Sequence, residues 1–217
     1  MFVGHLAVAF AAKRAKPDLS LAWTVAAVSF VDLLWPVLLL LGVERVAVAP
    51  GITAFTPLHF IHYPWSHSLV MGLAWGLIFA GFARMRGVGR DALPMLATLV
   101  LSHWLLDFLT HRPDLPLWPG GDQLYGLGLW NSIAGTLALE ATMWIGGLAL
   151  WISAFRPRGA NGWAAIVSFV LVSTMIWIGG PYAPPPPSGQ AVAVGALLGF
   201  SIIPWAWWIE RSADRRR

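Results

Sequence analysis

The sequence predicts an all-α fold, a polytopic transmembrane helix bundle of about six spans with a short N-terminal helix. Three observations predict this class. Hydrophobic residues make up 58% of the 217 residues and charged residues only 11%, whereas a soluble domain has roughly a quarter charged residues. The mean hydropathy is +0.68. Tryptophan, which collects at membrane interfaces, occurs 14 times. This composition excludes a soluble enzyme and a disordered protein.

The first expected element is a short helix over residues 1–12, which is apolar but too short to span a bilayer. Six longer apolar segments follow, each near the roughly 20 residues that a helix needs to cross about 30 Å of hydrocarbon. Helices are expected because lipid offers no hydrogen-bond partner to an open backbone. We expect residues 1–217 to form one integral membrane domain. The predicted spans cover residues 20–42, 65–83, 92–110, 129–155, 162–180 and 191–209.

The basic residues predict the orientation of these spans. Twelve of the 14 Lys and Arg residues fall before the first span, between the second and third, between the fourth and fifth, or after the sixth. The positive-inside rule then places both termini in the cytoplasm, as an even number of spans requires. We therefore expect a multi-pass protein of the cell (inner) membrane. The net charge of +4 is explained by this asymmetry, so no nucleic-acid partner is predicted.

Ionisable side chains inside the predicted spans are few, and they are all acidic residues or histidines. Such groups are costly in a membrane and usually serve function. At 1.5 Å of rise per residue, those in the first four spans lie about 18–25 Å from the cytoplasmic side, from mid-membrane outward. His5 can join them if the short N-terminal helix points into the bundle. The residues at this level are Asp32, His67, His103, Asp107 and Glu140.

Local spacing supports a common site. His103 and Asp107 are four residues apart and share a helix face, and His111 continues the stripe. Pro36 lacks the N–H that would bond the carbonyl of residue 32, so we expect a kink in the first span beside Asp32. Ser66 is expected to cap the second span, next to His67.

Carboxylates without a basic partner inside an apolar bundle would be protonated or strongly destabilising, and a bound divalent cation would resolve this with its own charge. Neutral imidazole and carboxylate are ligands that zinc accepts. We therefore predict a divalent metal site, most simply zinc, with one or two ions bound by His5, Asp32, His67, His103 and Asp107. Asp32 or Glu140 is the expected general base where it is not a ligand. Ser68, Thr110 and Asn131 are candidate groups for orienting a substrate. Taken singly, Glu140 or a histidine could instead be a protonated or hydrogen-bonded contact between helices.

Several short motifs carry a resemblance to a known family. They are Gly4-His5-Leu6-Ala7, Val31-Asp32-Leu33, His62-Tyr63-Pro64-Trp65-Ser66-His67-Ser68, the segment from His103 to His111, and Leu117-Trp118-Pro119. Together they resemble the YdjM-type family of membrane-bound, predicted metal-dependent hydrolases over roughly the first 120 residues. The resemblance implies site roles for His5, Asp32, His62, His67, His103 and Asp107. The sequence departs from the family pattern at Val31, Leu34, Tyr63-Pro64 and Ser66, so Glu140 or His111 is a candidate replacement ligand.

The leading hypothesis is a membrane-embedded metal-dependent hydrolase that uses a metal-activated water. Because the predicted site lies in the outer half of the bilayer, the expected partners are membrane lipid and a lipid-linked or amphiphilic phosphoester or ester. A proton- or ion-coupled transporter remains the alternative, since intramembrane acids and histidines also form proton relays. A noncatalytic scaffold with a closed structural metal site is the third interpretation.

Overall fold

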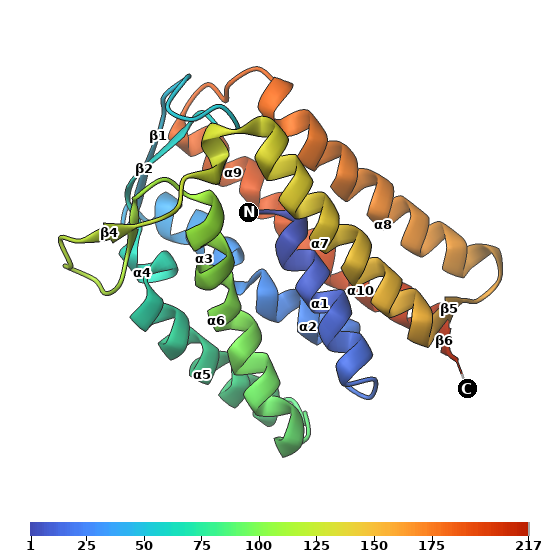
Figure 1. Cartoon of the computed structure of the whole chain (residues 1–217). Helices are drawn as coiled ribbons and strands as arrows, with labels where there is room; N and C mark the ends of the chain where they lie inside the picture. Colours follow the sequence, from blue (N-terminus) through green and yellow to red (C-terminus); the bar gives the residue numbers. More distant parts are fainter. Residues whose placement is uncertain (217) are drawn as a thin grey trace.

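A computed structural model describes residues 1–216, and it is mostly helical (Figure 1). The α-helices are α1 (Val3–Ala15), α2 (Leu21–Val28), α3 (Phe30–Leu40), α4 (Pro64–His67), α5 (Leu69–Met85), α6 (Leu93–Thr110), α7 (Ile133–Ala154), α8 (Gly159–Gly179), α9 (Gly189–Ala196) and α10 (Ile202–Arg211). The long helices α6, α7 and α8 run roughly along one direction (Figure 1). Short 3₁₀ turns lie at Arg90–Ala92, Leu129–Asn131 (η2), Gly180–Tyr182 and Leu197–Ser201 (η4).

Among the described residues, four helical segments are long and apolar enough to cross a membrane. They are Arg90–Thr110, Ile133–Ala154, Gly159–Tyr182 and Gly189–Arg211. The bent pair α2 and α3 makes a fifth if it is counted as one span. These correspond to five of the six predicted spans. The remaining one, predicted at 65–83, corresponds to α5, which has 17 residues and begins only after the separate short helix α4.

The first predicted span is bent, but not at the proline. The axes of α2 and α3 differ by 51°, and the break lies at Ser29, whose ψ of 0° departs from the helical value near −42°. Pro36 lies inside α3, which continues to Leu40. The predicted kink at Pro36 is therefore wrong in position. The bend turns α3 away from α2 just before Asp32, which lies in the first turn of α3.

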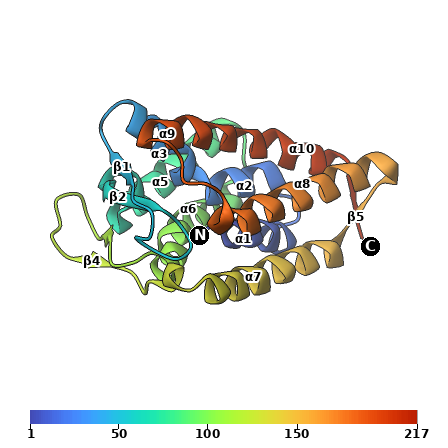
Figure 2. The same cartoon turned by 90° about the horizontal axis from the view of Figure 1, so that it is seen from above.

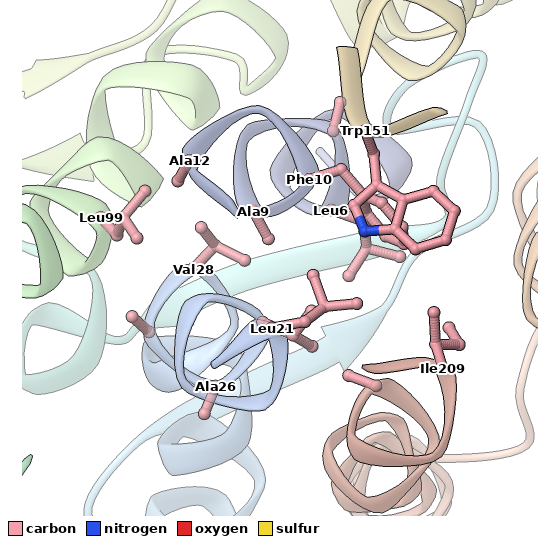
Figure 3. Close-up of a cluster of buried hydrophobic side chains, with 14 of the residues drawn as sticks. Leu6, Ala9, Phe10, Ala12, Leu21, Ala26, Val28, Leu99, Trp151 and Ile209 are labelled. Atoms are coloured by element: carbon pink, nitrogen blue, oxygen red, sulfur yellow. The ribbon is translucent and has the colours of Figure 1, made fainter. Parts of the chain in front are cut away.

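Helix α1 lies at the centre of the main apolar cluster (Figures 2 and 3). Its Leu6 and Phe10 are buried among residues of α2, α6, α7 and α10. Close approach to α7 depends on Gly147, because a Cβ there would lie 2.4 Å from the Ala7 carbonyl oxygen. Small residues at helix contacts are the usual way in which membrane helices pack closely. The short helix predicted at the N-terminus is thus a buried element of the bundle.

Within residues 1–216, three small antiparallel sheets, absent from the all-α prediction, lie at the two ends of the bundle. At one end, β1 (Arg45–Val48) pairs with β2 (Leu58–His62), and β3 (Leu115–Pro116) pairs with β4 (Leu124–Tyr125). At the other end, β5 (Phe155–Pro157) pairs with β6 (Ala213–Arg215). Figures 1 and 2 both show this separation. We call the first the sheet end and the second the basic end.

The basic end brings together the segments that carry most of the Lys and Arg residues. Lys16 after α1 pairs with Asp91 in the turn before α6. Arg14 donates to the Ser153 hydroxyl near the end of α7. These contacts place the loops predicted to be cytoplasmic at one end of the molecule.

Candidate metal centre

The second half of α6 presents a stripe of ionisable side chains to the interior near the sheet end. His103 Nε2 lies 3.1 Å from Asp107 Oδ2, and His111 Nε2 lies 3.6 Å from the same oxygen. All three side chains are buried. His111 follows the last residue of α6, Thr110, so the stripe extends just past the helix end. The spacing of four residues therefore produces the shared face that the sequence predicted.

His103 is the most informative member of the stripe. Its Nδ1 lies 2.8 Å from the Val28 carbonyl oxygen at the end of α2. A carbonyl only accepts, so Nδ1 carries a proton and donates it. The other nitrogen, Nε2, is buried without a hydrogen-bond partner among the described residues.

Nε2 of His103 nevertheless faces two acids, Asp107 Oδ2 at 3.1 Å and Asp32 Oδ1 at 3.5 Å. In the neutral ring this nitrogen presents a lone pair to two carboxylates, which is repulsive unless the ring is protonated or a metal cation lies between the ring and the acids. An orphaned buried acceptor facing acidic oxygens is the arrangement expected of a metal ligand, with its Nδ1–H fixed by a second partner.

Two further histidines converge on these acids from other elements. The ring of His5, in the first turn of α1, stacks on the ring of His103 with centroids 3.7 Å apart and an angle of 8° between planes. His5 Nε2 lies 3.0 Å from Asp107 Oδ1. His67, at the end of α4, places Nε2 at 3.4 Å from Asp32 Oδ1 and 3.9 Å from Asp107 Oδ2. Four separate elements thus supply the cluster.

The cluster contains two overlapping groups of donors. His5, His103 and Asp107 form one, and Asp32, His67 and His103 form the other; within each, one ligand atom per residue lies within 4.8 Å of the others. Three protein ligands of nitrogen and oxygen type are what a catalytic zinc site uses, leaving a position for water. Because the groups share His103, the geometry suits one ion with alternative ligands or two neighbouring ions.

Asp107 also has a cationic neighbour within the protein. The Met1 amino group lies 2.7 Å from Asp107 Oδ1. This single positive charge faces Oδ1, the oxygen that His5 approaches. It leaves Oδ2 and the Asp32 carboxylate facing His103 and His67.

Glu44, which the sequence analysis did not identify, supports His67. Glu44 lies between α3 and β1 and is buried, with its oxygens 2.8 Å from the Ser66 amide and 2.7 Å from the Ser66 hydroxyl. That hydroxyl also lies 2.7 Å from His67 Nδ1. Burial raises the pKa of Glu44, and the bonds from Ser66 partly offset the shift.

These contacts form a chain. If His67 Nδ1–H donates to Ser66 and Ser66 donates to Glu44, the lone pair on His67 Nε2 faces the cluster. Ser66 therefore holds the histidine, and it does not cap α5 as predicted. In the sequence, Glu44 is an acid in a predicted loop, and no other signal marks it as a partner of the cluster.

His111 has a similar second partner that the sequence analysis missed. Its Nδ1 lies 2.9 Å from Asp114 Oδ1, and Tyr63 donates to the same oxygen over 2.7 Å. Burial lowers the pKa of His111, which favours the neutral imidazole that can bind a metal. Burial, with Asp114 as the next cause, holds the pKa of Tyr63 well above its usual value.

Several predicted site residues lie outside the cluster. Glu140 accepts from the Phe2 and Gly4 amides at 2.8 and 3.1 Å through Oε2, so it caps amides at the start of α1 that have no partner within the helix. Its Oε1 is buried and has no partner within residues 1–216. Ser68 caps α5 by accepting from the Met71 amide, and Thr110 bonds the Asp107 carbonyl.

His62 and Asn131 are the other two predicted site residues that lie outside the cluster. His62 is in β2 opposite Arg45, and Asn131 is exposed in η2. The structure gives neither residue a contact with the cluster. Their roles, and the general-base role of Glu140, remain predictions.

The cluster lines a cavity of about 240 Å³. Asp32, His67, Asp107 and His111 form part of its wall, together with Glu140. The loop before β2 closes it from the sheet end, and the Phe55 amide anchors this loop by donating to the Trp130 carbonyl over 2.9 Å. His103 and His5 are not part of this wall, so this chamber adjoins the cluster on the side of its two acids, His67 and His111.

Comparison with family models, with curated proteins and with solved structures finds no match to this chain.

Proposed function

We propose that this protein is a membrane-embedded metal-dependent hydrolase. The observation that carries the proposal is the buried, unpartnered Nε2 of His103, which faces the carboxylates of Asp32 and Asp107. Zinc is the ion that the mixed imidazole and carboxylate donor set favours. His5, His67, His103, Asp32 and Asp107 are the proposed ligands, one or two ions being held among them.

The chemistry follows from the donor set and the chamber. A zinc ion supplies a Lewis acid that polarises a phosphoryl or carbonyl oxygen and lowers the pKa of a bound water to about 7. In hydrolysis the water oxygen bonds to phosphorus or carbon, the ester bond to the leaving oxygen breaks, and one proton of the water ends on that oxygen. Where it is not a ligand, Asp32 is better placed than Asp107 to accept the proton first, because its side chain is 43% exposed, whereas Asp107 is buried.

The membrane setting defines the substrate class that we propose. The protein would be a multi-pass component of the cell membrane with about six spans, α5 included, and with the basic end in the cytoplasm. The cluster near the sheet end then lies toward the outer half of the bilayer. A lipid-linked or amphiphilic phosphoester or ester is the substrate that can reach a site at this depth. The resemblance to YdjM-type predicted hydrolases supports the same proposal.

The test begins with metal content. We expect the protein, purified in detergent, to contain one or two equivalents of zinc by elemental analysis. It should hydrolyse dodecyl 4-nitrophenyl phosphate or 4-nitrophenyl dodecanoate, lose this activity on chelation, and regain it when zinc is restored. A metal-free preparation that is folded and equally active would overturn the proposal.

A further inference from the structure

A second cavity adjoins the candidate metal centre on the side of the helix bundle. Its volume is about 400 Å³, and it lies between α3, α8 and the segment formed by α9, η4 and α10. Asp32 lines both this cavity and the chamber of the cluster, and so does Phe2. His5 forms part of its wall as well. The two spaces therefore meet at residues of the candidate site.

The rest of the lining is mainly apolar. Leu6 and Leu33 line one side and Val172 and Ile176 of α8 another, and the polar residues besides Asp32 and His5 are mainly three serines. The apolar part of such a cavity accepts apolar ligands. The polar groups that could orient a head group thus lie at one end, and the remainder suits hydrocarbon.

The space exists because small residues line the third side. Gly195, Ala196 and Gly199 contribute to the wall formed by α9 and η4. A Cβ added at Gly195 would meet nothing within 4 Å. At the rim, the side chains of Ile176 and Leu198 are exposed, by 59% and 76%. The cavity thus opens sideways, between two helical segments long and apolar enough to span a membrane.

A larger apolar cavity provides a contrast. It has a volume of about 650 Å³ and lies between α2, α3, α5 and α10. Its lining within the described part of the chain contains no histidine and no acidic residue. Size and apolar character therefore do not distinguish the smaller cavity from the larger one. What distinguishes the smaller cavity is that Asp32 and His5 form part of its wall.

We propose that the smaller cavity binds the hydrocarbon chain of an amphiphilic substrate whose polar head lies at the His/Asp cluster. This inference rests on the proposed function and adds a binding subsite to it. The chain would enter sideways from the membrane between α8 and η4 and reach toward Asp32.

Photocrosslinking tests the subsite directly. The probe is dodecyl phosphate with a diazirine in the middle of its chain, added to the zinc-loaded protein in nanodiscs, and the labelled peptides are mapped by mass spectrometry. We expect labelling on α8 around residues 172–176 and on η4. Unlabelled dodecyl phosphate should compete for these sites, and butyl phosphate at the same concentration should not.

Two variants and one matched control make the test specific. Gly195→Leu extends a side chain into the cavity, and Val172→Phe fills it from the opposite wall. Each should lower labelling at these sites by about tenfold. Gly81→Leu is the control, because Gly81 is also exposed, helical and free of atoms within 4 Å of an added Cβ, but lies on α5 away from the cavity.

Bound zinc, measured in the same samples, separates the two proposals. Zinc retained in all three variants, with labelling lost only in the two cavity variants, supports the subsite. Zinc bound but labelling spread evenly over the bundle, or unchanged in Gly195→Leu and Val172→Phe, overturns the subsite and leaves the metal centre standing. A folded protein that binds no zinc overturns the proposed function instead.

Discussion

Both ends of the bundle bury charged groups, but they satisfy them differently. At the basic end, Lys13 is buried, and its ammonium group lies 2.8 Å from the Pro17 and Leu19 carbonyls and 2.7 Å from Glu210. Its three donors thus have three acceptors. Near the sheet end, His103 Nε2 and His5 Nδ1 have no partner among residues 1–216, although the acids lie close by.

This difference distinguishes buried polar groups that contribute only to folding from those that bind a ligand. A buried polar group that contributes only to folding is normally hydrogen-bonded, because an unsatisfied one costs about 1–3 kcal/mol. The basic end follows this rule and holds α1 against its neighbours. The His/Asp cluster departs from it, which is expected where a ligand completes the coordination. Substitutions at the two ends should therefore have different effects, on zinc binding at one end and on stability at the other.

The largest effect is expected from the shared ligands. His103→Ala and Asp107→Ala should each weaken zinc binding by more than about 100-fold, beyond the range for loss of a supporting hydrogen bond. Competition titration with a chelating dye measures the affinity, and membrane insertion serves as the control for folding. Unchanged zinc stoichiometry in both variants would show that neither residue is a ligand.

Lys13→Met should have the opposite pattern. Removing the cation leaves two carbonyls and Glu210 without their partner. We expect this to lower the free energy of unfolding by about 2 kcal/mol, less than for a fully buried ion pair, because Glu210 is partly exposed. Zinc affinity should stay the same. Thermal unfolding in detergent measures the loss, and Lys16→Met, in the more exposed pair with Asp91, is the control that should change little. Zinc loss in Lys13→Met would remove the distinction between the ends.

Much of this architecture follows from the order of residues along the chain. An apolar segment of about 20 residues is long enough to cross the bilayer as a helix, and lipid leaves its backbone no other way to satisfy its hydrogen bonds. The long spans were therefore predictable. The stripe from His103 to His111 was predictable because helical spacing fixes which side chains share a face. Its convergence with Asp32 followed from similar depths in neighbouring helices, whereas His67 reaches the cluster from the separate short helix α4 and not from the predicted second span.

The remaining features depend on contacts between distant segments, which periodicity does not encode. The bend at Ser29 arises between two apolar helices whose composition is continuous across the break. The cap that Glu140 provides to α1 joins residues 136 positions or more apart, and nothing local distinguishes it from a general base. Glu44 lies in a predicted loop, where an acid is ordinarily solvated. Its burial is visible only once α4 packs against it.

Two neighbouring serines, both fully buried, provide a finer comparison within the sheet end. Ser66→Ala breaks the contact between Glu44 and His67, so zinc affinity should fall by about tenfold. Ser68→Ala removes the cap of α5 and should lower the free energy of unfolding by about 1 kcal/mol with zinc affinity unchanged. Chelator competition and thermal unfolding measure both quantities in both variants.

Glu44→Gln extends the same comparison to the acid. It should reproduce the zinc effect of Ser66→Ala, because an amide is a weaker acceptor for the serine hydroxyl than a carboxylate. If Ser66→Ala and Ser68→Ala changed zinc affinity equally, the chain of hydrogen bonds to His67 would have no role in binding.

The smallest effect is expected from Asp32→Asn in the metal-free protein, and its sign is the informative part. Asp32 faces the nitrogens of His67 and His103 at 3.4 and 3.5 Å and shares the chamber with Asp107. If the site is arranged for a cation, its acids repel one another when the cation is absent. Replacing one of them with a neutral residue of the same shape should then raise the free energy of unfolding by about 0.5–1 kcal/mol while weakening zinc binding, the usual exchange of function for stability. Thermal unfolding with and without chelator measures both. A loss of stability comparable to that of Lys13→Met would instead show that Asp32 is a structural partner of the histidines, as Glu210 is of Lys13.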